Sequence, residues 1–196
     1  MKINQISVVF FSATGRTRRA AEQVASALPL AADWLDITPH AADGLARSFG
    51  PDELVVWAAP VYGGRLALQA AQRFARLKGK QTPAVLLAVF GNRDYDDALL
   101  EMQDISQAAG FVPFACAAPV AEHSLMPGIA AGRPDEQDAQ QLADFARGLW
   151  QTLQQAPAAA DLRVPAVKGK RPYKDYPSIP FKPAASQACV QCGVCA

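Results

Sequence analysis

Histidine and cysteine are scarce in this sequence, and long hydrophobic runs are missing. The 196 residues include two histidines and four cysteines, and only Cys116 precedes the last eight residues. This distribution excludes the disulfide framework of a small secreted protein. No apolar run reaches the roughly 18 residues that a membrane helix needs, so we expect no membrane span. The formal net charge of +1 gives no support for nucleic-acid binding.

The N-terminal region also lacks the continuous apolar core of a secretory signal peptide. Lys2, an apolar run and the triplet Ala25-Ser26-Ala27 imitate such a peptide, but arginines at positions 16, 18 and 19 interrupt it. Because three thiols gather at the end of the chain, they suggest a metal-thiolate site in a reducing compartment. We therefore expect a cytoplasmic protein.

The length fits one α/β domain plus an appendage. Five mainly apolar segments alternate with segments of helical periodicity, and continuous apolar runs are typical of strands that are covered on both faces. The pattern predicts a doubly wound parallel sheet, although periodicity does not reveal its strand order. The expected strands are residues 3–11, 34–37, 53–59, 84–90 and 111–120; the expected helices are 16–28, 41–49, 68–77, 97–109 and 134–154, with Pro134 at the first helical position.

The regular pattern stops at residue 156, so we assign residues 1–155 to the domain. Prolines punctuate residues 156–188, which predicts an extended arm running over the domain surface, and residues 189–196 hold the cysteines. Residues 1–155 carry 13 Lys and Arg against 16 Asp and Glu, whereas residues 156–196 carry 6 against 2. The basic arm could dock on an acidic surface, but solvated charges are the simpler interpretation.

Three loops of unusual composition follow the first, third and fourth strands: residues 12–17, 60–65 and 90–97. In an open parallel sheet, ligands bind outside the carboxyl ends of the strands. The first loop joins hydroxyl residues, a glycine and arginines to a helix N-terminus, which suits a phosphate. Tyr62 and Tyr95 could stack on a flat ring. For each loop alone, ordinary turn chemistry and helix capping remain the alternative.

The two histidines and two missing motifs limit the catalytic possibilities. His40 is expected in an exposed loop. His123 follows the fifth strand, and we favour loop-fixing hydrogen bonds over acid–base catalysis for it. No Cys-x5-Arg loop follows the first strand, which excludes the phosphatases of this architecture, and no G-x-G-x-x-G motif offers a separate nicotinamide site.

The terminal Cys189-x-x-Cys192-x-x-Cys195 is how a bacterial iron–sulfur module begins. The complete module continues with a fourth cysteine, whereas this sequence ends at Ala196, so we expect an iron–sulfur cluster only with further C-terminal cysteines. A zinc or three-iron site on these three cysteines is the weaker alternative. Cys116, in the apolar fifth strand, is expected to be a buried structural thiol.

The loops together resemble a known family. Ser12-Ala13-Thr14-Gly15-Arg16-Thr17 is similar to the flavodoxin phosphate loop, with arginine where asparagine is commonest. The whole chain resembles the flavodoxin–ferredoxin fusion proteins of anaerobic and facultative bacteria. The resemblance extends over the segments 60–65, 91–99, 122–124, 132–135 and 170–174 and the terminal cysteines.

This resemblance implies a flavodoxin-like sheet with strand order 2-1-3-4-5, noncovalently bound FMN and electron transfer. It places the FMN phosphate in the first loop and the ring between the other two. The implied FMN-binding residues are Ser12, Ala13, Thr14, Gly15, Arg16, Thr17, Pro60, Val61, Tyr62, Gly63, Phe90, Gly91, Asn92, Tyr95 and Asp97; the implied metal ligands are Cys189, Cys192 and Cys195.

Three functions remain open from the sequence. The first is electron transfer between FMN and a ferredoxin-type iron–sulfur centre, with an unknown redox partner protein. The second is an NAD(P)H-dependent FMN or quinone reductase on the same fold. The third is a redox-sensing or scaffold protein that binds its partner through the basic, aromatic arm.

Overall fold

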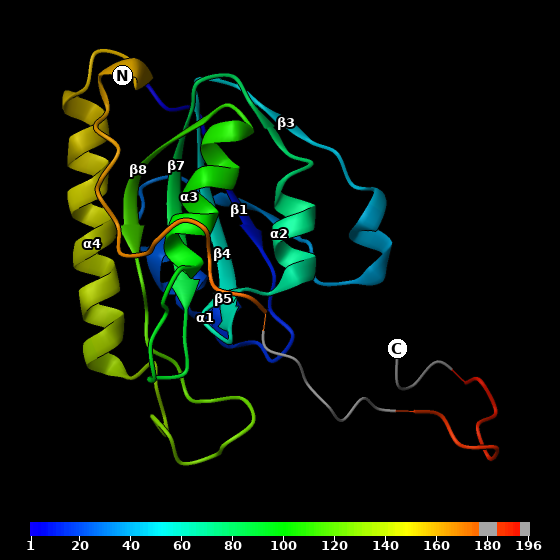
Figure 1. Ribbon diagram of the computed structural model, residues 1–196. Coiled ribbons are helices and arrows are strands. Elements are labelled where there is room, and N and C mark those ends of the chain that lie inside the picture. The colour runs from blue at the N-terminus through cyan, green and yellow to red at the C-terminus, as the bar shows by residue number, and fades with distance from the viewer. Residues whose placement is uncertain (177–183, 193–196) are drawn as a thin grey trace.

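The computed structural model describes residues 1–176 and 184–192. Its centre is a parallel sheet of five strands in the order β2-β1-β4-β7-β8, with the short β5 paired antiparallel to β4 (Figure 1). Numbered along the chain, these five parallel strands have the order 2-1-3-4-5, so the fold prediction is confirmed. The strands are β1 (Gln5–Phe10), β2 (Ala32–Asp36), β4 (Glu53–Tyr62), β5 (Arg65–Leu66), β7 (Thr82–Val89) and β8 (Phe111–Ala117).

Helices cover both faces of the sheet, which is why the central strands are mainly apolar. All eight residues of β7 are buried. One core joins the sheet to α1 (Arg16–Ser26) and α4 (Glu136–Gln155), and the other joins it to α2 (Leu68–Phe74) and α3 (Ala98–Ala108) (Figure 1). Trp57 of β4 is fully buried in the second core and stacks on Phe74 at 4.5 Å between ring centroids. No helix of the described residues is both long enough and apolar enough to cross a membrane.

Three predicted segments differ from the structure. The expected helix over residues 41–49 is a short 3-10 helix, η1 (His40–Gly44), followed by β3 (Ser48–Phe49), which pairs with β6 (Lys78–Gly79). Pro134 precedes the N-cap Asp135 and is not the first residue of α4. The third strand does not stop before Pro60 but continues to Tyr62.

β4 continues past Pro60 because the missing proline N–H costs the sheet no hydrogen bond between strands. β1 ends at Phe10, opposite Ala58, so the proline nitrogen lies beyond the end of that neighbour. The Pro60 carbonyl still accepts a hydrogen bond from the Ala67 N–H at 3.2 Å. A proline is tolerated in a strand where its missing N–H needs no partner. The extension carries the second loop outward as a β4–β5 hairpin.

Candidate functional site

A cavity of about 520 Å³ lies at the carboxyl ends of β1, β4 and β7. Its volume is within the range of small-molecule sites. The first two predicted loops and the beginning of the third meet here, joined by residues 121–125, which follow the fifth strand. The lining residues are Ala13, Thr14, Arg16, Thr17, Pro60, Val61, Tyr62, Gly63, Val89, Phe90, Gly91, Ala121, Glu122, His123, Ser124 and Leu125.

The first loop presents main-chain donors to one end of the cavity. Gly15, with φ at +79°, is the N-cap of α1 and has no side chain that could cap the helix itself. The Ser12 hydroxyl accepts the Arg18 N–H at 3.1 Å. Within residues 1–176, the N–H groups of positions 13–17 donate to no protein acceptor. Unpaired N–H groups at the positive end of a helix dipole favour an anion.

Arg16 adds a cation to this end of the cavity. Its guanidinium lies 3.5 Å from the Glu122 carboxylate, and both side chains are partly buried. Ser12 and Gly15, both predicted to hold a phosphate, do not line the cavity. Ser12 instead shapes the loop, since its N–H also donates to the Thr38 hydroxyl at 2.8 Å. The anion-facing part is therefore Ala13, Thr14, Arg16 and Thr17.

The other end of the cavity is apolar and aromatic, with Val61, Tyr62 and Phe90 in its wall. Tyr62 is 42% exposed, and partial burial raises the pKa of its phenol, so it stays neutral at physiological pH. These side chains form a surface suited to one face of a flat ring.

His123, from the segment that follows the fifth strand, also lines the apolar end of the cavity. A Cβ added at Gly91 would lie 2.7 Å from His123 Cδ2, so only glycine allows this approach. His123 Nδ1 accepts the N–H groups of Leu125 and Met126, each at 3.2 Å, which confirms the expected loop-fixing role. With Nδ1 accepting, the neutral ring carries its proton on Nε2.

Sequence reasoning had not placed residues 121–125 among the ligand-binding residues. The signal was available, because a loop after any strand of a parallel sheet reaches the same edge. The bridge between Phe90 and Val120 extends the pairing of β7 and β8 and carries this segment to the cavity. The composition of the segment, with one histidine and one glutamate, did not distinguish it from an ordinary loop.

Three residues of the third loop that the resemblance assigns to FMN binding, Asn92, Tyr95 and Asp97, do not line this cavity. Asn92 is in a left-handed conformation with φ at 65°. Tyr95 packs edge-on against Phe90 at 5.6 Å between centroids. The Asp97 carboxylate accepts the backbone N–H groups of Lys170 and Lys174 at 3.0 and 2.8 Å. Asp97 therefore binds the C-terminal arm.

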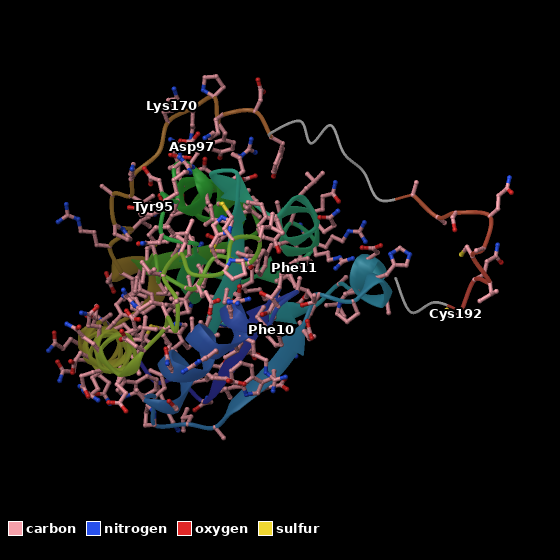
Figure 2. The ribbon with its side chains drawn as sticks, turned by 90° about the horizontal axis from the view of Figure 1, so that it is seen from below. Phe10, Phe11, Tyr95, Asp97, Lys170 and Cys192 are labelled. Carbon is pink, nitrogen blue, oxygen red and sulfur yellow. The ribbon has the colours of Figure 1, made fainter. Side chains whose placement is uncertain are left out.

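The arm, here residues 156–176, docks on the acidic surface of its own domain, which corrects the interpretation that its charges are simply solvated. The four arm-binding aspartates are Asp94, Asp96, Asp97 and Asp104. Lys168 reaches Asp94 at 2.6 Å, and the Lys174 ammonium reaches Asp96 at 2.8 Å. Arg171 donates to Asp104 at 2.7 Å. Figure 2 shows Lys170 of the arm beside Asp97.

A buried ion pair joins the β4–β5 hairpin to α3 under the arm. Arg65 Nε and Nη2 each donate to the Glu101 carboxylate at 2.8 Å, and the side chains are 13% and 5% exposed. The same carboxylate accepts the Leu66 N–H at 3.0 Å. The Arg65 guanidinium lies over the rings of Tyr173 and Tyr176, at 4.7 and 4.5 Å from their centroids.

We expect the arm to leave the domain only in strong acid. The Lys168 ammonium lowers the pKa of Asp94 to about 2, and hydrogen bonds from the arm lower the pKa of the other three arm-binding aspartates. A lowered carboxyl pKa stabilises the docked state above the ordinary value near 4, and this contribution is lost as the pH falls through the lowered values.

Amide hydrogen exchange of Lys170 and Lys174, corrected for its intrinsic pH dependence, measures this release. Protection should be constant from pH 8 to 5 and should fall below about pH 4. A buried amide of β7 is the internal control. Release of the arm between pH 8 and 5 would contradict the assignment of these contacts to the aspartates.

The cysteines do not form a centre in the described residues. Cys189 and Cys192 are exposed, and Cys195 lies outside the described residues. Among residues 1–176 and 184–192, no group of three or more histidine, cysteine or carboxylate side chains is placed to hold a metal ion. Cys116 in β8 is half-buried and not fully buried as expected, and this burial raises the pKa of its thiol to about 12.

Comparison with known proteins supports the fold. No family profile and no curated protein matches this chain. Among solved structures it is similar to the flavodoxin of Streptococcus pneumonia TIGR4, at 20% identity over 76% of this chain and 99% of that one, with a TM-score of 0.52. Oxidised Flavodoxin 2 from Bacillus cereus follows at 12% identity, the same coverages and a TM-score of 0.53. A short-chain flavodoxin associated with a PDU bacterial microcompartment gives 16%, the same coverages and 0.51. The chain therefore has a flavodoxin-like α/β fold.

Proposed function

We propose that this chain is an FMN-dependent electron-transfer protein. The observation that carries the proposal is a single cavity with two chemically different ends. One end has the unpaired N–H groups at the start of α1 and Arg16, and the other has Tyr62, Phe90 and His123. An anionic tail joined to a flat aromatic ring matches both ends at the site where this fold class binds ligands.

The residues present fit FMN by their donor chemistry. The N–H groups of Ala13, Thr14, Arg16 and Thr17, the hydroxyls of the two threonines and the guanidinium of Arg16 would hold the phosphate. Val61, Tyr62 and Phe90 would cover the ring and exclude water. When bound, FMN supplies the redox chemistry, and the protein tunes it through nearby hydrogen bonds and charges.

The charged side chains around the proposed ring site are mostly paired with one another. Asp94, Asp96 and Asp97 could disfavour an anionic reduced ring, but arm cations and backbone N–H groups occupy their carboxylates. Arg65 is likewise paired with Glu101. Among the cavity-lining residues, Arg16 and Glu122 carry opposite charges, so we infer that the site is close to neutral without its ligand.

We also propose Cys189, Cys192 and Cys195 as ligands of an iron–sulfur centre that further C-terminal cysteines would complete and that exchanges electrons with the flavin. The spacing of the three thiols supports this part of the proposal. Iron and sulfide analysis, after reconstitution without oxygen, of a chain extended to supply further cysteines tests it, with Cys189, Cys192 and Cys195 replaced by serine as the control. Absence of iron in the reconstituted protein would remove the centre and leave the flavin proposal standing.

The flavin proposal is tested by titrating the purified protein, freed of any ligand, with FMN and with riboflavin. We expect quenching of FMN fluorescence at one site and a higher thermal midpoint, with weaker binding of riboflavin because it lacks the phosphate. Protein that neither binds nor is stabilised by FMN would contradict the proposal. Rapid NAD(P)H oxidation by the FMN-loaded protein, without any other protein present, would favour the reductase function over electron transfer.

A further inference from the structure

The arm contacts both loops that carry the aromatic end of the cavity. In the β4–β5 hairpin, Arg65 pairs with Tyr62, which lines the cavity. The Arg65 guanidinium donates to the Lys174 carbonyl at 2.6 Å and contacts the rings of two arm tyrosines. The position of Tyr62 at the mouth of the cavity is thus linked to the arm through its hairpin partner.

The third loop is linked to the arm through its acidic turn. Lys168 Nζ lies 5.5 Å from the centroid of Tyr95, whose ring packs on the cavity residue Phe90. Asp96 is held in a left-handed conformation, with φ at 41°, that is uncommon for residues other than glycine. The Lys174 ammonium bonds its carboxylate at 2.8 Å. The arm thereby holds a turn that has little preference for this shape by itself.

The hairpin and the turn also contact one another, so they respond to the arm as one unit. The Asp97 N–H donates to the Gly64 carbonyl at 2.9 Å. A Cβ at Gly64 would lie 2.1 Å from an Asp96 carboxylate oxygen, which shows how closely the two segments approach. Neither could shift to follow a displaced arm without moving the other.

We propose that residues 168–176 are a strap that positions the aromatic end of the cavity, with Arg65 and Asp97 as the positioning residues that transmit it. Docking of the strap and occupancy of the cavity are then coupled. Because such coupling is reciprocal, undocking weakens the ligand, and the ligand strengthens docking by the same factor. The inference rests on the proposed function, since FMN is the ligand used to measure it.

Two variants and two controls test the strap. Asp97→Asn replaces one of the two carboxylate oxygens that accept the Lys170 and Lys174 N–H groups with an NH2 group, which cannot accept a hydrogen bond. Lys174→Ala removes only the exposed ion pair with Asp96. Lys174→Arg is the conservative rescue. Arg147→Ala removes an exposed ion pair with Asp144 on α4 and leaves the arm untouched. Because Asp97 does not line the cavity, a change in FMN affinity would reach the ligand through the strap.

We expect the Kd of FMN to rise about fivefold or more in Asp97→Asn and about two- to threefold in Lys174→Ala, within the usual range of coupling between sites. Lys174→Arg and Arg147→Ala should keep the wild-type Kd. In the wild-type chain, saturating FMN should slow amide exchange at Lys170 and Lys174 by about the factor found for Asp97→Asn. If the strap only stabilised the fold, FMN would not change amide exchange at these two residues.

The failures of the two proposals are distinguishable. If the wild-type chain binds FMN, but FMN does not slow exchange in the strap and both variants keep the wild-type Kd, the strap proposal is wrong and the proposed function stands. If Asp97→Asn does not fold, Lys174→Ala decides the question. A raised Kd of FMN that Lys174→Arg restores supports the strap, and an unchanged Kd contradicts it. If the wild-type chain binds no FMN, the proposed function fails and the coupling fails with it.

Discussion

Replacing Glu101 with alanine is expected to lower the free energy of unfolding by about 3–5 kcal/mol, because it leaves the buried Arg65 charge without its partner. The change also removes the acceptor of the Leu66 N–H. Chemical denaturation followed by circular dichroism measures the loss. For a chain of this size we expect a thermal midpoint lower by about 2–4 °C per kcal/mol.

Two further variants separate the lost ion pair from lost packing. Replacing both Arg65 and Glu101 with methionine should recover part of the stability, because a buried pair often costs as much desolvation as it gains in attraction. The recovery is incomplete, since the Leu66 N–H and the Lys174 carbonyl still lose their partners. Asp144→Ala breaks an exposed pair with Arg147 and should change the free energy of unfolding by less than about 1 kcal/mol. Equal losses in Glu101→Ala and Asp144→Ala would show that the buried pair has no special role.

Reversing the charge of Arg16, by Arg16→Glu, is expected to weaken FMN binding about 100-fold, since a charged hydrogen bond contributes roughly 1.5–3 kcal/mol and repulsion from the new carboxylate replaces it. Riboflavin affinity should stay within about threefold of wild type, because riboflavin has no phosphate to repel. A glutamate at the first position of α1 is favourable to the helix dipole, which offsets its repulsion from Glu122, so the fold should be retained.

Fluorescence titrations with both ligands at several salt concentrations measure this effect. Arg18→Glu is the matched control, since Arg18 pairs with Glu22 on the exposed side of α1 and does not line the cavity. Arg16→Asn should be milder and should reduce the salt dependence of FMN binding. Equal weakening of FMN and riboflavin by Arg16→Glu would contradict a phosphate site beside Arg16.

The contacts of Asp97 and Glu122 show where sequence reasoning reached its limit. Asp97 follows the fourth strand, so its position at the ligand edge was predictable. The hydrogen-bond partner of its carboxylate was not predictable, because the arm residues that donate to it lie more than 70 residues away in the chain. Glu122 was recognised as part of a loop, but its ion pair with Arg16 forms only when the ends of the first and fifth strands meet.

The amino-acid sequence by itself determined the alternation of strands and helices, the parallel sheet and the loops that meet at its ligand edge. These features follow from local periodicity and from the geometry of parallel strands, which short stretches of sequence encode. Resemblance, rather than periodicity, supplied the strand order.

Only the tertiary structure decided which part of the opening loop faces the cavity and what the arm does. Ser12 and Gly15 shape the turn while Ala13, Thr14, Arg16 and Thr17 face inward, a division set by the start of α1 and by Thr38. Ion pairs with the third loop and α3, and stacking on Arg65 of the hairpin, dock the arm on the domain. Such contacts depend on side chains distant in sequence being brought within a few ångströms, which no local pattern specifies.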